Sequence, residues 1–167
     1  VVEYVFALRA DYFEVLAQAV NSNGGEILNL IGDAILAIFP IEERHAGDPC
    51  RACAASMAAA RTALANLQAL CAERRAADKC ELRCGIALHV GDVMYGNIGA
   101  ADRLDFTVVG PAVNLVSRIE GLNRDLAMPL VFSAAFAKHW GGKARSLGLH
   151  ALKGIAAPQE VFTLAEE

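Results

Sequence analysis

A single carboxylate interrupts an apolar run near the N-terminus. Asp33 lies at the middle of the stretch from Asn29 to Phe39, NLIGDAILAIF, in which almost every other residue is apolar. Gly32 and Asp33 at its centre favour two short strands joined by a tight turn, so the pattern predicts a hairpin with the carboxylate at its tip. Aspartate also suits turns for its own sake, because its side chain bonds the local backbone. The pattern alone leaves open whether Asp33 serves the turn or a ligand.

A second candidate site lies on the helix predicted from Pro111 to about Asn123. Gly110-Pro111 opens this helix, because proline fits the first helical position, where its missing N–H is not needed. Asn114 and Arg118 are four residues apart, which places an amide and a guanidinium on one face of the helix. Such a pair suits an anionic ligand. Arg118 could equally be a solvated arginine paired to Glu120.

Two further polar interruptions fall within predicted strands. Asn29 has apolar neighbours, so its amide either bonds backbone at a sheet edge or points into a ligand pocket. Gly96, Asn97 and Gly99, followed by Asp102-Arg103, predict a glycine-rich turn between strands. A turn of this kind lets backbone approach a phosphate or a partner chain.

The composition limits the class of protein. The 167 residues fit one domain with a sizeable core, and 55% hydrophobic against 20% charged residues gives it apolar surface to bury. No apolar run reaches the length of a membrane span, and the N-terminus lacks a signal pattern, which favours a cytoplasmic location. A net charge of −4 argues against a nucleic-acid partner. The odd number of cysteines predicts reduced thiols: Cys50, Cys53, Cys71, Cys80 and Cys84.

The remaining pattern predicts the elements that position these residues. Apolar residues recur every three or four positions over residues 1–20, which indicates an amphipathic helix. The expected order after it is the hairpin around Gly32-Asp33, a long Ala-rich helix from Asp48-Pro49 to about Ala77, a second hairpin turning at Gly91-Asp92, a strand DFTVV, the helix from Pro111, a strand PLVF, a short helix Ser133 to Trp140, and strands near Arg145 to Leu152 and at EVFTL. Two hairpins among alternating helices predict an α+β fold, with helices packed on a mixed or antiparallel sheet.

Three stretches in this order resemble the catalytic domain of class III nucleotidyl cyclases, the adenylate and guanylate cyclases. They are GGEILNLIGDAILAIF, GIALHVGDVMYGNIGAADRLDFTVVGPAVNLVSRIEGL and LKGIAAPQEVFTL. The resemblance implies one catalytic domain over residues 1–167, with a ferredoxin-like βαββαβ core and C-terminal additions. It also implies a head-to-tail homodimer whose active sites are built from both chains.

The resemblance assigns chemistry to several of the residues above. In such cyclases two divalent metals, Mg²⁺ or Mn²⁺, lie between a pair of aspartates and the triphosphate of ATP, and the ribose 3'-hydroxyl attacks the α-phosphorus. Asp33 matches the second of those aspartates. Asn114 matches the residue that orients the ribose, and Arg118 the residue that stabilises charge on the α-phosphate. Lys153 matches a lysine that binds the terminal phosphates, or is a solvated lysine before a turn glycine.

The chain departs from the family pattern at two places. The first metal aspartate belongs to a phrase like D-I-x-G-F-T upstream of the first helix, and this chain begins after it. The residues expected to read the base are Asn29 and Thr107, where adenylate cyclases have lysine and aspartate, and guanylate cyclases glutamate and cysteine. An amide and a hydroxyl can satisfy adenine N1 and its amino group, whereas guanine is best met by a carboxylate. We therefore expect ATP to be preferred over GTP.

Other functions remain compatible with these residues. A catalytically silent homologue, serving as a dimerisation or nucleotide-sensing module, would explain the missing aspartate, whereas Asn114, Arg118 and Lys153 argue for an enzyme. A guanylate cyclase is the nearest alternative activity. A diguanylate cyclase would need a GG-acidic-acidic-Phe turn, which Gly91-Asp92 does not supply. We interpret His89 and Met94 as core or interface residues, and sensor domains or a membrane tether elsewhere in a longer parent chain are compatible with the pattern.

Overall fold

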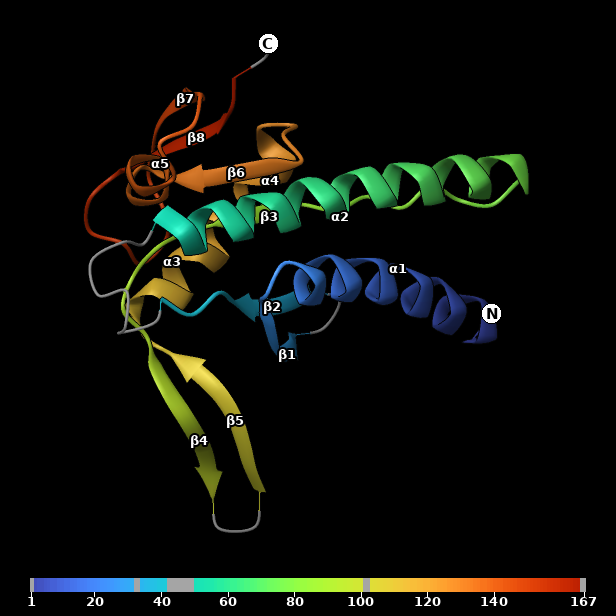
Figure 1. Cartoon of the computed structure of the whole chain (residues 1–167), viewed down its shortest axis with the longest axis horizontal. Coiled ribbons are helices and arrows are strands. Elements are labelled where there is room, and N and C mark those ends of the chain that lie inside the picture. Colours follow the sequence, from blue (N-terminus) through green and yellow to red (C-terminus); the bar gives the residue numbers. More distant parts are fainter. Residues whose placement is uncertain (1, 32–33, 42–49, 101–102, 166–167) are drawn as a thin grey trace. The chain divides into compact units, whose positions relative to one another are not determined.

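The computed structural model describes residues 2–31, 34–41, 50–100 and 103–165 (Figure 1). Internal contacts divide the chain into two compact units. The first comprises Val1–Pro40 and Ala54–Cys84, and the second Ile41–Cys53 and Gly85–Glu167.

The first unit contains the hairpin that the sequence predicted around Asp33. Helix α1 (Val2–Ser22) contacts strand β1 (Glu26–Ile31), and β1 pairs antiparallel with strand β2 (Ala34–Ile38). The register places Ile31 opposite Ala34 at one end of the pair. The predicted first helix and first hairpin are confirmed, while Asp33 itself lies outside the described residues.

A tight turn joins α1 to β1. The Asn23 side-chain amide donates to the Ala19 carbonyl at 2.8 Å, which satisfies one of the free carbonyls at the end of the helix. A Cβ at Gly25 would lie 2.8 Å from Val20 Cγ1 and 2.6 Å from Phe39 Cζ. Only glycine fits between these two side chains, so this position holds the chain close as it enters β1.

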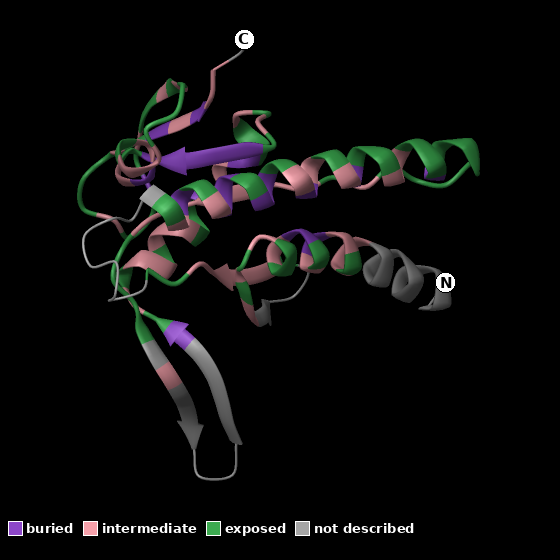
Figure 2. Cartoon of the chain, in the orientation of Figure 1, coloured by how far each residue is buried: buried purple, intermediate pink, exposed green. Residues whose placement is uncertain are grey.

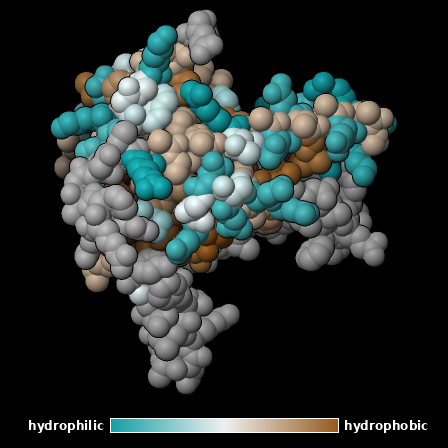
Figure 3. Space-filling model, in the orientation of Figure 1, coloured by the Kyte–Doolittle hydropathy of each residue, from teal (hydrophilic) through white to brown (hydrophobic). Residues whose placement is uncertain are grey.

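Helix α2 (Cys50–Ala76) confirms the predicted long Ala-rich helix. Its buried positions recur at three or four residues and include Cys53, Met57, Ala60, Ala63 and Leu67. The small residues among them let neighbouring atoms approach this face closely. Figure 3 shows hydrophilic side chains interspersed with apolar ones over the C-terminal half of α2.

A cysteine joins α2 to the segment that follows it. The Cys71 Sγ donates to the Leu82 carbonyl at 3.2 Å and accepts from the Leu82 N–H at 3.4 Å. Arg74 Nε donates to the Cys80 carbonyl at 2.9 Å, so a second side chain of α2 holds the same segment. Among the described cysteines, Cys71 and Cys80 are free thiols, as the sequence predicted.

The second unit is built on a four-stranded mixed sheet. Strand β3 (Ile86–Leu88) pairs parallel with β6 (Leu130–Ser133), and β8 (Gln159–Leu164) pairs antiparallel with both β6 and β7 (Ala144–His150), giving the order β3-β6-β8-β7. All four residues of β6 are buried (Figure 2). An α+β fold with a mixed sheet is therefore confirmed.

The second hairpin lies elsewhere than the sequence predicted. Strand β4 (Met94–Ala100) pairs antiparallel with β5 (Arg103–Val109), and the two form a sheet of their own that extends away from the rest of this unit (Figure 1). Gly91-Asp92 is instead the loop between β3 and β4, because β3 takes β6 as its partner. Gly96, Asn97 and Gly99, predicted to form a turn, lie within β4.

The core of the second unit lies between the sheet and two short helices. Helix α3 (Pro111–Glu120) is followed by the single turn α4 (Leu122–Asp125). Ile119, Val131, Leu152 and Val161 form the buried cluster, and α3 contacts both β3 and β6. Helix α5 (Ala134–Trp140) begins at Ser133, whose hydroxyl accepts from the Phe136 N–H at 3.1 Å.

Candidate active site

Helix α3 presents one apolar and one polar face, each with residues one turn apart. Ile119 is fully buried, and Leu115 packs against the same cluster. Asn114 and Arg118 precede these two residues by one position and are both exposed. The apolar pair Leu115 and Ile119 therefore fixes the rotation of the helix, and the exposed pair shares one face as the spacing predicted.

The side chain of Arg118 is exposed on α3. Glu120, its alternative partner, is exposed as well, and no ion pair joins the two. Within residues 108–165, whose side chains the structure describes, Asn114, Arg118 and Lys153 have no side-chain hydrogen bond or ion pair. The described side chains therefore give no support to Arg118 as half of a surface pair with Glu120.

The segment that carries Lys153 packs against the same buried cluster as α3. Its neighbour Leu152 belongs to the buried cluster that also contains Ile119, the neighbour of Arg118. Gly154 follows with a φ of 81°, and the Ile155 N–H donates to the Leu152 carbonyl at 3.0 Å, which makes a tight turn at Lys153. The segments that contain Ile119 and Leu152 thus meet in the core. Each exposes a cationic side chain next to its buried residue, Arg118 in the first and Lys153 in the second.

The remaining predicted site residues are placed by their backbone or lie outside the described residues. Asn29 is in β1 opposite Leu36, in the first unit, and Thr107 is in β5 opposite Gly96, in the second unit. Thr107 belongs to the same unit as Asn114, Arg118 and Lys153. Asp33 is not among the described residues.

The described residues do not by themselves make a metal centre. No group of three or more His, Cys, Asp or Glu side chains in that part of the chain is arranged to hold a metal ion. Because Asp33 is outside it, the geometry offers no ligand set against which Mg²⁺ or Mn²⁺ could be fitted. The described helices likewise include none that is both long and apolar enough to cross a membrane.

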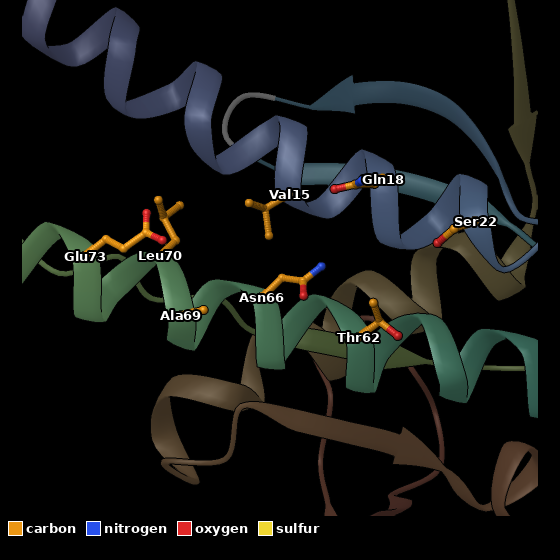
Figure 4. A pocket seen from close by; sticks show the side chains of 8 residues that line it. All are labelled: Val15, Gln18, Ser22, Thr62, Asn66, Ala69, Leu70 and Glu73. Carbon is orange, nitrogen blue, oxygen red and sulfur yellow. The ribbon is translucent and has the colours of Figure 1, made fainter.

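A shallow groove lies within the first unit and is separate from these residues. Val15, Gln18 and Ser22 on α1 face side chains of α2 across it (Figure 4). Its volume is about 520 Å³, and the α2 side is lined by Thr62, Asn66, Ala69, Leu70 and Glu73. None of the predicted site residues lines this groove, so we do not assign it to the nucleotide.

Comparisons with known proteins identify the family. Residues 3–133 match the family described as "Adenylate and Guanylate cyclase catalytic domain". The chain belongs to this family, and the resemblance noted in its sequence is confirmed.

Named relatives and solved structures agree with the assignment. The chain is 30% identical to adenylate cyclase 1 of Rhizobium meliloti over 96% of its own length, and 29% identical to an adenylate cyclase of Anabaena cylindrica over 81%. It spans only about a quarter of these relatives, 24% and 26%. A bacterial light-regulated adenylyl cyclase superposes with a TM-score of 0.79 at 26% identity, covering 98% of this chain and 46% of that one.

Two further solved structures show the range of the fold. The adenylyl cyclase CyaB from P. aeruginosa superposes with a TM-score of 0.83 at 22% identity, covering 99% of this chain and 84% of that one, which shows the shared fold. A guanylyl cyclase superposes with a TM-score of 0.77 at 26% identity, covering 97% of this chain and 80% of that one. The fold is therefore that of nucleotidyl cyclases.

Proposed function

We propose that this chain is the catalytic domain of an adenylate cyclase, which converts ATP to 3',5'-cyclic AMP and pyrophosphate. The observation that carries the proposal is the exposed pair Asn114 and Arg118 on one face of α3, without a side-chain partner among the described residues, in a chain of the cyclase family. We further propose that the domain acts as a head-to-tail homodimer with composite sites. The relatives are about four times longer, so the parent chain is proposed to carry further domains, such as sensors.

Three polar residues of the second unit are proposed to act in this reaction. Asn114 orients the ribose through its amide, which can both donate and accept. Arg118 donates to the α-phosphate as negative charge develops there, and a planar guanidinium matches phosphate oxygens better than an ammonium does. Lys153, on its tight turn, binds the terminal phosphates as a point charge. The exposure of all three leaves their donors available to a nucleotide.

We assign one metal-binding role, to Asp33. The tip of a hairpin presents a carboxylate without burying its charge, and carboxylate oxygens suit Mg²⁺ or Mn²⁺. Such ions, when bound, lower the barrier to in-line attack on phosphorus by stabilising charge on the attacking and leaving oxygens. The confirmed pairing of β1 with β2 supports this place for Asp33.

The preference for ATP rests on Asn29 and Thr107. An amide and a hydroxyl satisfy the edge of adenine, and neither supplies the carboxylate that guanine prefers. We expect moderate discrimination, because no charged group enforces the choice. The two named relatives are both called adenylate cyclases, which supports ATP as the proposed substrate. The similar guanylyl cyclase structure makes GTP the alternative to test.

The test uses the full-length protein with Mn²⁺ and either ATP or GTP. We expect cyclic AMP and pyrophosphate to form from ATP in equal amounts. The kcat/KM for ATP should be higher than the kcat/KM for GTP. Arg118→Ala is expected to lower kcat by about 10²–10³, as for other donors aimed at developing charge. Asp33→Ala should abolish turnover.

The matched control is Arg124→Ala, which removes an exposed arginine from the neighbouring helix α4 and should leave kcat within about twofold. Nucleotide binding without any cyclic product would replace the enzyme by a silent nucleotide-sensing module. A GTP rate equal to or above the ATP rate would reverse the base preference.

A further inference from the structure

We propose that His89 and Gly91 are positioning residues. They fix the position of the first turn of helix α3 and thereby the orientation of Asn114 and Arg118. We call the loop His89–Val93, between β3 and β4, the α3 seat. This inference rests on the proposed cyclase function, because it concerns the orientation of the residues assigned to the nucleotide. Neither residue is assigned to the reaction by its own chemistry.

Gly91 touches α3 where a side chain would not fit. A Cβ added there would lie 2.8 Å from the Ala112 Cβ and 2.9 Å from His89 Nε2. Contacts this short force something to move, and Ala112 is fixed to the helix backbone. The distance between the α3 seat and the second residue of α3 is therefore set by the absence of a side chain at position 91.

A second glycine makes the contact from the helix side. Gly110 has a φ of 148°, which favours glycine, and its Cβ would lie 3.4 Å from the Asp92 carbonyl and 3.6 Å from Val93 Cα. The Gly110 carbonyl accepts from the N–H groups of Val113 and Asn114 at 3.2 and 3.3 Å. The residue that packs on the seat is thus the one that starts the hydrogen bonding of α3.

His89 fixes the other side of the seat. Its Nδ1 is 2.8 Å from the hydroxyl of Ser133, which is 4% exposed at the end of β6. The same hydroxyl accepts from the Phe136 N–H at the start of α5. Burial lowers the pKa of the His89 imidazole, so the ring is held neutral near pH 7, with Nε2 toward Gly91. The imidazole therefore connects the sheet to the seat.

Together these contacts fix both ends of a short helix. Ile119 anchors the C-terminal part in the buried cluster, and the seat fixes the first turn. Asn114 lies between the two anchors and Arg118 beside the second. A displacement of about 1 Å in a positioning element can cost about 10²-fold in rate, because the reacting groups are no longer aligned.

The test begins with Gly91→Ala in the full-length protein, assayed with Mn²⁺ and ATP. We expect kcat to fall by about tenfold to 100-fold while KM changes by less than about threefold. Adding Ala112→Gly removes the shortest contact and should recover at least half of the loss on a logarithmic scale. The matched control is Gly121→Ala at the other end of α3, where the nearest contact would be an ordinary 3.4 Å.

A double-mutant cycle separates positioning from general damage. In an Arg118→Ala background, Gly91→Ala should lower kcat by a smaller factor than in the wild type, because one of the two groups that it misaligns is already absent. Full additivity of the two losses, or no recovery with Ala112→Gly, would overturn the proposal. His89→Asn, which can keep a polar atom near Ser133, should retain more kcat than His89→Ala, and equal losses would remove His89 from the seat.

Hydrogen exchange provides the readout that does not depend on turnover. In Gly91→Ala the amides of Val113 and Asn114 should exchange faster, and Ala112→Gly should restore their protection. If the wild-type protein makes no cyclic nucleotide, the proposed function fails while the seat is still judged by these amides. Unchanged exchange in Gly91→Ala would overturn the seat whatever the activity.

Discussion

Helices α2 and α3 both bury one face and expose the other, yet they are held in different ways. The buried face of α2 runs from Cys53 to Leu67 and consists largely of small residues. Helix α3 has ten residues, one fully buried anchor at Ile119 and two glycine contacts between its first turn and the loop His89–Val93. The long helix is thus fixed by a broad area, and the short one by a few specific points.

This difference predicts different responses to substitution. A change on the buried face of α2 alters the packing of that face and should appear as a loss of stability. A change at the anchors of α3 also moves the face that carries Asn114 and Arg118, so it should appear in both stability and turnover. Three measurements on the protein test whether the two helices respond in these different ways.

The largest effect is expected at the anchor of α3. Ile119→Ala removes a fully buried side chain and should cost about 2–5 kcal/mol of unfolding free energy. The kcat of the protein that remains folded should fall as well, because α3 loses the contact that fixes its rotation. Urea unfolding and steady-state kinetics measure the two losses. Ile119→Val is the control, with an expected cost of about 0.5–1.5 kcal/mol. A normal kcat in folded Ile119→Ala would show that the anchor of α3 affects stability alone, as is expected for α2.

An intermediate effect is expected on α2. Ala63→Leu places a large side chain where 5% of the residue is exposed, and overpacking of this kind costs about 1–3 kcal/mol. The kcat per folded molecule should be unchanged, since α2 carries none of the proposed site residues. Thermal unfolding of Ala58→Leu, at an exposed position of the same helix, gives the matched control. A loss of kcat in Ala63→Leu without a loss of stability would contradict the expectation that substitutions in α2 change stability and leave turnover unchanged.

The smallest effect is expected from pH. Burial lowers the pKa of the His89 imidazole below its ordinary value of 6.5. Below that pH the imidazole is protonated in the unfolded chain but still neutral in the folded state. The free energy of unfolding should therefore fall as the pH drops from 6.5 toward the folded pKa. Unfolding free energies at about pH 7.5 and about pH 5.5 should therefore differ more for the wild type than for His89→Asn. Identical pH profiles would show that the ring is not held neutral by the fold.

The sequence was sufficient where a local pattern decides the structure. The periodicity of α1 and α2, the hairpin around Gly32-Asp33 and the proline start of α3 were all predicted, because each depends on neighbours within a few residues. The second hairpin was placed wrongly at Gly91-Asp92. Strand β3 instead pairs with β6, which follows much later in the chain, and apolar patterning does not specify so distant a partner.

The candidate site shows the same division. The spacing of Asn114 and Arg118 predicted one shared face, and their exposure agrees with it. The bond between His89 and Ser133, and the contact of Gly91 with Ala112, join residues from separate elements. No feature of spacing along the chain points to such pairs, although glycine at position 91 was a visible signal that some close approach was needed.

The contact between Gly91 and Ala112 also bears on how this sequence can change over time. Two positions far apart in the chain share one small space, so added volume at position 91 is tolerable only after volume has been lost at position 112. Of the two orders in which the same pair of substitutions could arise, one passes through an intermediate that fits and the other through one that does not. Evolutionary history, and not composition alone, would then decide which neighbouring sequences are reachable.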